Sequence, residues 1–171
     1  MTKIRHSLWA AGCCMLVAGA ISVGVPWSAS GQEQPERGGR HGNLAQRWAD
    51  AWNSHDADAV AELFARDGFF EDVPFGVVAH GTREIRAVAK SFFTVVPDLH
   101  ISVVSGSLNA GRGSIEWVFS GTDQGVYRTG KTFAIRGTTV LELAGNRISR
   151  DSDYWDLATL LRQIGMMPSG L

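Results

Sequence analysis

The spacing of apolar residues predicts helices in the first half of this 171-residue chain. Three segments carry apolar side chains at every third or fourth position, which is typical of helices with one buried face. The first segment begins after a cap at Asn43. The second runs from the break at 53–56 through Phe64 to a stop at 67–68, and the third runs from 81 to 96. Between the last two, residues 69–73 predict a short strand that Pro74 stops.

After Pro97 the apolar spacing changes to every second residue, which predicts strands. The alternating segments are 99–103, 115–119, 132–143 and 148–155. A turn at 144–146 joins the last two as a hairpin, and residues 156–164 read as a capped helix that Gly165 ends. Helices followed by antiparallel strands imply an α+β fold. We expect a curved sheet that wraps around the helices and keeps an apolar cavity at its open end.

Residues 1–30 have the pattern of a secretory signal peptide. A positive start precedes an apolar run over residues 8–25, and small residues at Ser28 and Ser30 suit cleavage after Ser30. We therefore expect export through the Sec pathway to the periplasm or the cell exterior. An uncleaved segment would instead anchor the chain in a membrane, and a lipoprotein site at Cys13 is the weaker alternative. The predicted boundaries are a signal peptide over 1–30, a flexible linker over 31–42 and a folded domain over 43–167.

Charge and composition exclude several classes of function. The chain has 16 Lys plus Arg and 17 Asp plus Glu, a balance that argues against a nucleic-acid partner. Both cysteines lie in the N-terminal segment, so the exported chain would have no thiol nucleophile. The later histidines, His41, His55, His80 and His100, are scattered, and no phosphate-binding loop is present. We expect no metal, no other cofactor and no membrane contact after cleavage.

Three groups of residues resemble the superfamily of nuclear transport factor 2, in its ketosteroid isomerase-like and SnoaL-like polyketide cyclase branch. They are residues 46–58 with 61–67, residues 70–74 with 81–85, and residues 145–148 continued through 153–156 to 162–165. The resemblance implies a cystatin-like cone, in which three N-terminal helices pack on a strongly curved, mainly antiparallel sheet with a short C-terminal helix. It also implies a homodimer that pairs through the outer face of the sheet. Candidates for that face are Val118, Thr132, Ala134 and Val140.

Two acidic residues match positions where these relatives keep proton-transfer groups. Asp72 matches the general base of ketosteroid isomerase, and Asp153 matches the strand that carries the acid/base aspartate of SnoaL-like cyclases. Such a carboxyl group moves protons between carbon and oxygen when it lies in a dry pocket. The structural alternatives are a turn-capping Asp72, and an Asp153 that forms a salt bridge to Arg136 or Arg150.

Aromatic residues are expected to line the cavity around these acids. Trp48 matches the oxyanion-stabilising tyrosine of the isomerase, and Thr138 falls near its second oxyanion donor. Because neither residue has the acidity of its counterpart, steroid isomerisation is not expected. The predicted substrate-binding residues are Trp48, Trp52, Phe70, Phe92, Trp117, Phe119, Thr138 and Trp155.

The sequence therefore predicts an exported SnoaL-like protein that binds a small apolar molecule in an aromatic cavity. The resemblance implies cofactor-free acid/base chemistry, either aldol-type cyclisation or isomerisation next to a carbonyl group. The alternative is a non-catalytic module of the same fold that binds a ligand or serves assembly.

Overall fold

The computed structural model describes residues 42–168, which form four helices and one six-stranded sheet. In chain order the elements are α1 (Gly42–Asn53), α2 (Ala57–Glu62), β1 (Phe64–Asp72), β2 (Val77–His80), α3 (Gly81–Val95), β3 (His100–Asn109), β4 (Arg112–Thr122), β5 (Thr132–Ala144), β6 (Arg147–Trp155) and α4 (Leu157–Gln163). The predicted signal peptide and nearly all of the predicted linker lie outside the described residues. Within residues 42–168, no helix has the length and apolarity needed to cross a bilayer.

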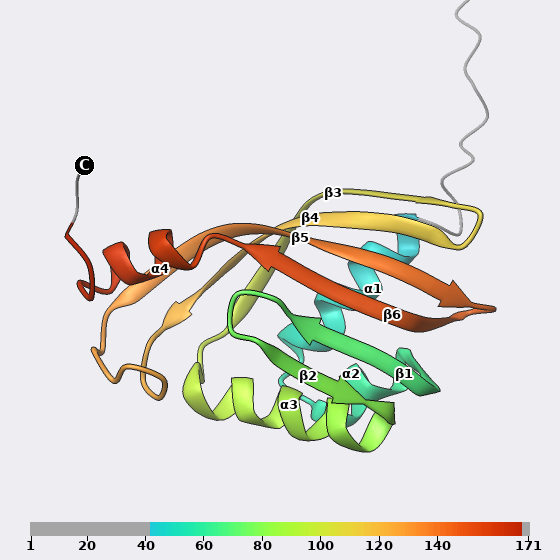
Figure 1. The fold of residues 1–171 in the computed structure, drawn as a ribbon, viewed down its shortest axis with the longest axis horizontal. Coiled ribbons are helices and arrows are strands. Elements are labelled where there is room, and N and C mark those ends of the chain that lie inside the picture. Colours follow the sequence, from blue (N-terminus) through green and yellow to red (C-terminus); the bar gives the residue numbers. More distant parts are fainter. Residues whose placement is uncertain (1–41, 169–171) are drawn as a thin grey trace, which may run out of the picture. The chain divides into compact units, whose positions relative to one another are not determined.

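The α+β architecture that the sequence predicts is confirmed. The strands lie in the order β2-β1-β6-β5-β4-β3, and helices α1, α2 and α3 cover one face of the sheet (Figure 1). Helix α1 packs on β3, and α3 packs on β1 and on α2. Helices α1 and α3 bury their apolar stripes against the concave face and α2 packs mainly on α3, so the core lies between the helices and the sheet.

Two aspartates cap helices through the same local contact. The side chain of Asp56 accepts a hydrogen bond from the backbone N–H of Asp58 at the start of α2. The side chain of Asp156 accepts one from the backbone N–H of Ala158 at the start of α4, as the sequence predicts. Gly165 follows α4 with a φ of +79°, the left-handed conformation in which glycine commonly ends a helix.

The segment between α2 and α3 differs from the sequence prediction. Helix α2 ends at Glu62, and Phe64 already belongs to β1, where it lies opposite Ile148 of β6. Strand β1 is therefore longer than the predicted 69–73. Strand β2 was not predicted at all; it returns through a turn at Gly76, whose φ is +65°, and pairs antiparallel with β1. Local spacing could not show either feature, because both depend on pairing with a distant or very short strand.

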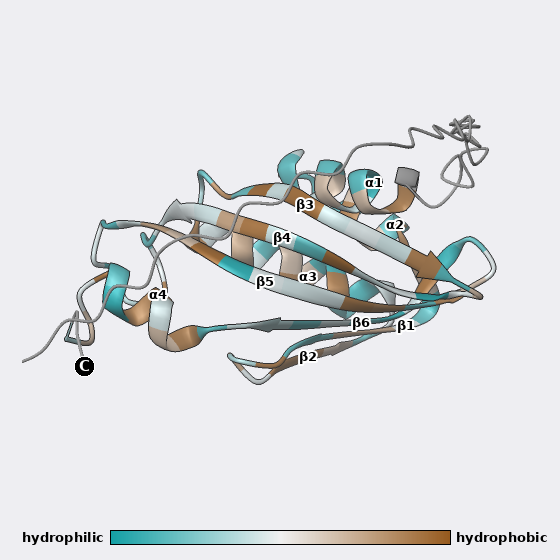
Figure 2. Ribbon diagram, turned by 90° about the horizontal axis from the view of Figure 1, so that it is seen from above, coloured by the Kyte–Doolittle hydropathy of each residue, from teal (hydrophilic) through white to brown (hydrophobic). Residues whose placement is uncertain are grey.

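Strands β3 to β6 form the antiparallel meander that the two-residue alternation predicts. The alternation is visible as bands of apolar and polar colour along β4 and β5 (Figure 2). Phe133, Ile135 and Leu141 of β5 are buried, whereas Ala134 and Val140 are exposed. Val118 and Thr132 belong to the same outer face as Ala134 and Val140. These are the residues that the sequence assigns to a dimer face, and dimer formation stays a prediction.

One strand pair positions the site. Strands β1 and β6 run parallel, although every other pair in the sheet is antiparallel. This pairing places Asp72 directly opposite Asp153, although Asp153 lies 81 positions further along the chain. Because side chains of paired residues point to the same face of a sheet, the two carboxyl groups meet on the concave side.

Candidate active site

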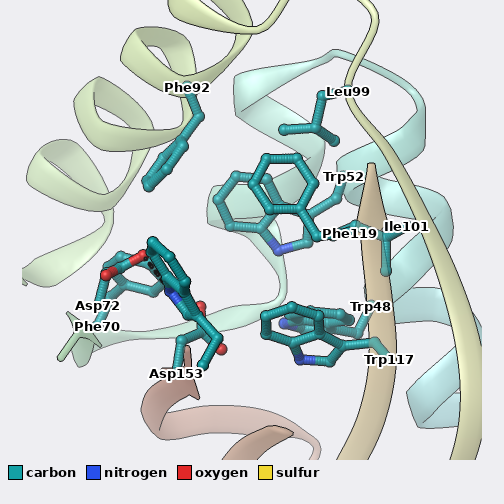
Figure 3. Close-up of a pocket in the computed structure, with 11 residues that line it drawn as sticks. Trp48, Trp52, Phe70, Asp72, Phe92, Leu99, Ile101, Trp117, Phe119 and Asp153 are labelled. Atoms are coloured by element: carbon teal, nitrogen blue, oxygen red, sulfur yellow. Dashed lines mark hydrogen bonds between the residues drawn. The ribbon is translucent and has the colours of Figure 1, made fainter. Parts of the chain in front are cut away.

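A cavity opens on the concave side of the sheet, between α1, α3 and strands β1, β3, β4 and β6 (Figure 3). It measures about 380 Å³ when the space open to solvent is counted. The enclosed part has room for only about two or three waters, so as it stands the cavity suits a small ligand. Its lining residues are Trp48, Trp52, Phe70, Asp72, Phe92, Leu99, Ile101, Trp117, Phe119, Asp153 and Trp155. Both predicted acids and seven of the eight predicted substrate-binding residues are among them; Thr138 is not.

The aromatic wall is one packed cluster. Trp48 of α1 stacks on Trp117 of β4 with ring centroids 6.4 Å apart, and it meets Trp52 edge-on at 6.3 Å. Trp52 in turn packs edge-on against Phe92 of α3 at 5.9 Å and lies 6.2 Å from Phe70 of β1. Because these rings come from four different elements and hold each other in place, the wall is a preorganised apolar surface.

Asp72 serves both as a turn cap and as part of the cavity wall. It is only 4% exposed. One carboxylate oxygen accepts a hydrogen bond from the backbone N–H of Phe75 at 3.0 Å, and the other accepts one from the indole N–H of Trp155 at 3.2 Å. Burial raises the pKa of Asp72, and these two hydrogen bonds oppose the rise because they stabilise the charged form.

Asp153 is held by a relay of two hydrogen bonds. The indole N–H of Trp117 donates to the hydroxyl of Thr139 at 2.8 Å, and that hydroxyl donates to Asp153. The predicted alternative, a salt bridge to Asp153, is not observed among the described residues. Arg136 pairs with Glu116 and Arg150 with Glu71, both away from the cavity. Burial, followed by the neighbouring Asp151 carboxyl group, raises the pKa of Asp153 well above its ordinary value.

A third carboxyl group, Asp151, lies behind the cavity wall and was given no role by the sequence analysis. It is fully buried, and its Oδ2 accepts a hydrogen bond from the indole N–H of Trp48 at 2.9 Å. Burial raises its pKa to about 7, although the hydrogen bond from Trp48 opposes the rise. The signal in the sequence was the alternation that places Asp151 and Asp153 on one face of the strand.

The structure changes the candidate hydrogen-bond donors. Trp48 was a candidate donor to a ligand, but its N–H is already bonded to Asp151. Thr138 was expected in the cavity, but it lies opposite Tyr154 on the outer face and its hydroxyl donates to the carbonyl of Ile115 at 3.2 Å. The buried neighbour Thr139 faces the cavity side instead, because a shift of one residue along a strand reverses the side-chain direction.

Among the cavity-lining tryptophans, Trp52 has the free indole N–H. The N–H groups of Trp48, Trp117 and Trp155 are bonded to Asp151, Thr139 and Asp72. That of Trp52 is buried and has no hydrogen-bond partner within residues 42–168. A buried donor without a partner is costly, so this group is available to an acceptor atom of a ligand.

The described residues contain no group of three or more side chains placed to hold a metal ion. His55, for example, stacks on Phe93 and its Nε2 bonds the backbone carbonyl of Leu99 at 2.8 Å, which is a structural role. The arrangement can therefore offer a ligand carboxyl groups, an indole N–H and aromatic faces.

Comparison with known proteins gives a consistent picture. Residues 42–164 match the family model of the SnoaL-like polyketide cyclases. A protein of ketosteroid isomerase-like fold from Catenulispora acidiphila, in complex with trimethylamine, is 26% identical and superposes with a TM-score of 0.68 over 75% of this chain and 96% of its own. A protein assigned to the SnoaL-like polyketide cyclases from a Jannaschia species is 16% identical, with a TM-score of 0.66 over 78% and 99% of the two chains. Another so assigned, from Shewanella denitrificans, is 22% identical, with a TM-score of 0.63 over 74% and 97%. No protein of curated function matches the sequence significantly.

Proposed function

Because the chain belongs to the SnoaL-like polyketide cyclase family, we propose that it moves a proton next to the carbonyl group of a small, mostly apolar substrate without a cofactor. One observation carries the proposal. Asp72 and Asp153 lie directly opposite each other on β1 and β6, in the wall of an aromatic cavity, and no basic side chain forms an ion pair with either of them within residues 42–168. Carboxyl groups in such a site are suited to take up and release protons near neutral pH.

The hydrogen bonds of the two acids assign them different roles. Asp72 accepts two N–H hydrogen bonds, which favour its ionised form, so it is the general base. Asp153 lies beside Asp151, which favours its protonated form, so it is the hydrogen-bond donor to the carbonyl oxygen. The free indole N–H of Trp52 is a second donor for the same oxygen. Two donors aimed at a developing negative charge form an oxyanion hole.

The reaction follows from these roles. Asp72 takes a proton from the carbon next to the carbonyl, the C–H electron pair forms a carbon–carbon double bond, and the carbonyl oxygen becomes an enolate that Asp153 stabilises. In isomerisation, Asp72 returns the proton to a different carbon. In cyclisation, the enolate carbon attacks a second carbonyl of the same molecule, and the new alkoxide takes the proton from Asp72. Neither route needs an oxidant or a reductant.

The size of the cavity restricts the substrate. Phe92, Phe119 and Trp155 separate the cavity from a second apolar pocket that reaches α4 and the loop between β4 and β5. A substrate larger than a few carbon atoms has to displace these three side chains and extend into the second pocket. A small ketone requires the smallest such change.

A second candidate function is the non-catalytic binding of a small alkylammonium ion. Aromatic faces attract organic cations, and the buried carboxyl groups would supply the counter-charge. The similar structure from Catenulispora acidiphila, in complex with trimethylamine, supports this alternative.

The test is exchange of hydrogen for deuterium next to the carbonyl of cyclopentanone, followed by NMR in deuterated water. General acid/base catalysis is worth about 10²–10⁴-fold in rate. We expect Asp153→Asn and Asp72→Asn to lower the exchange rate by about that factor while both variants remain folded. Glu71→Gln, which removes a carboxyl group from the outer face beside Asp72, is the matched control and should exchange normally.

Two results would reject the catalytic role. One is a rate for Asp153→Asn equal to that of the Glu71→Gln control. The other is an absence of exchange on any small ketone, combined with calorimetric binding of trimethylammonium that Asp153→Asn weakens. The second result would establish the binding module instead.

We also propose that the mature protein is exported after cleavage near Ser30. The support is the sequence pattern of a positive start, the apolar run over residues 8–25 and the small residues Ser28 and Ser30. N-terminal sequencing of the secreted protein should begin close to Gly31. Recovery of the intact chain in the membrane fraction would favour the anchor.

A further inference from the structure

The fully buried Asp151 has no part in the proposed chemistry, although burying a carboxyl group without a counter-charge is costly. Trp48 donates a hydrogen bond to its Oδ2, and its Oδ1 has no hydrogen-bond partner among the described residues. A polar atom left in this position calls for an explanation.

The surroundings of Asp151 contain acids and no base. Its direct neighbours in the sheet are the apolar Phe70 on β1 and Leu141 on β5, and α1 presents the indole of Trp48. The titratable groups that face it are Asp153, two residues along β6, and Asp72 on β1. Three carboxyl groups thus share one buried region, and no basic side chain within residues 42–168 pairs with any of them.

We propose that Asp151 is a positioning residue that shares one proton with Asp153 and thereby keeps Asp153 in the protonated form that the substrate meets. This inference rests on the proposed function, in which Asp153 donates a hydrogen bond to the carbonyl oxygen. Without substrate, the Asp153 O–H points to Asp151 Oδ1. A carbonyl oxygen in the cavity then replaces Asp151 as the acceptor of that hydrogen bond.

Elementary electrostatics supports the shared proton. Two carboxyl groups that neighbour each other on one face of β6, both buried, do not readily ionise together, because two like charges would repel each other there. In the shared arrangement that we propose, a hydrogen bond from Asp153 to Asp151 lowers the pKa of the acceptor and raises that of the donor. The indole N–H of Trp48 increases this difference between the two pKa values, because it stabilises a negative charge on Asp151 and not on Asp153. Asp151 is therefore the member that ionises first.

NMR of the unaltered protein tests the shared proton without a substrate. The two carboxyl carbons should titrate in the same two steps, since coupled groups lose protons as a pair. The indole N–H of Trp48 should shift with the first step, whereas the unbonded indole of Trp52 serves as an internal control that does not follow it. Independent single-step titrations of Asp151 and Asp153 in the ordinary carboxyl range would overturn the proposal.

The variant Asp151→Asn tests the effect on Asp153. Asparagine keeps the size of the side chain and an oxygen for Trp48, but it removes the charge. We expect the midpoint of Asp153 to fall by about one pH unit or more, and the first step at Trp48 to disappear. The control Glu71→Gln should leave the midpoint of Asp153 and the first titration step of Trp48 unchanged. An unchanged midpoint of Asp153 in a folded Asp151→Asn variant would refute the inference, even if the Asp153→Asn exchange experiment supports catalysis.

Discussion

The buried carboxyl groups predict that this protein becomes more stable as the pH is lowered from about 8 to about 5. Burial raises the pKa values of Asp72, Asp151 and Asp153 above those of the unfolded chain. Between the unfolded and the folded pKa the native state binds more protons than the unfolded state. The free energy of unfolding is therefore highest at low pH in this window and falls as the pH rises.

The pKa of Asp151 sets the size of this change in the free energy of unfolding. A rise from 3.8 to about 7, at about 1.4 kcal/mol per unit, corresponds to about 4 kcal/mol that is lost between roughly pH 4 and pH 7. Asp153 adds to the loss, because its pKa is raised well above the ordinary value. A domain is commonly stable by only about 5–15 kcal/mol, so the effect is large enough to measure.

Below about pH 4 the trend reverses. Hydrogen bonds from the Thr122 hydroxyl and from the Thr129 and Tyr127 backbones lower the pKa values of Asp98 and Asp123. Their contribution to stability is present above the unfolded pKa and is lost as acid protonates them in the folded state. Maximum stability is therefore expected between about pH 4 and pH 6.

Urea unfolding followed by far-ultraviolet circular dichroism, at intervals from about pH 5 to pH 8, measures this dependence. Each extra proton bound by the native state should change the free energy of unfolding by about 1.4 kcal/mol per pH unit. Asp151→Asn should reduce the slope, and Glu71→Gln should keep it. A free energy that is flat or rises from pH 5 to pH 8 would refute the assignment of buried, proton-binding carboxyl groups.

Two substitutions test the support of the cavity wall. Thr139→Val removes the hydroxyl between Trp117 and Asp153 and should destabilise the fold by about 1–3 kcal/mol. The matched control Thr138→Val loses one longer hydrogen bond on the outer face and should destabilise the fold less. Equal urea midpoints for the two variants would contradict the relay. Gly137→Ala places a methyl group against the Trp117 indole, so it should lower the free energy of unfolding by about 1–3 kcal/mol and alter tryptophan fluorescence. A variant as stable as the parent protein would show that this wall is not tightly packed.

Local patterns were sufficient for the parts of the fold that local contacts stabilise. The hairpin at Gly145 and the final helix with its Asp156 cap were predicted from turn and cap residues, and both are confirmed. The end of α2 and the start of β1 were wrong, because Leu63 and Phe64 continue a helical spacing. Phe64 nevertheless pairs with Ile148, which lies 84 positions further along the chain.

The sequence by itself determined the α+β class, the order of most elements and the aromatic and acidic composition of the cavity. These follow from periodicity and residue type, which act over a few neighbouring positions. Tertiary structure alone decided which donors are free and which carboxyl groups interact. The parallel pairing of β1 with β6 places Asp72 opposite Asp153, and the packing of α1 lets the Trp48 indole N–H donate its hydrogen bond to Asp151. Hydrogen bonds and burial depend on atoms that are distant in the chain, so no spacing along the sequence shows that Thr139, and not Thr138, holds Asp153.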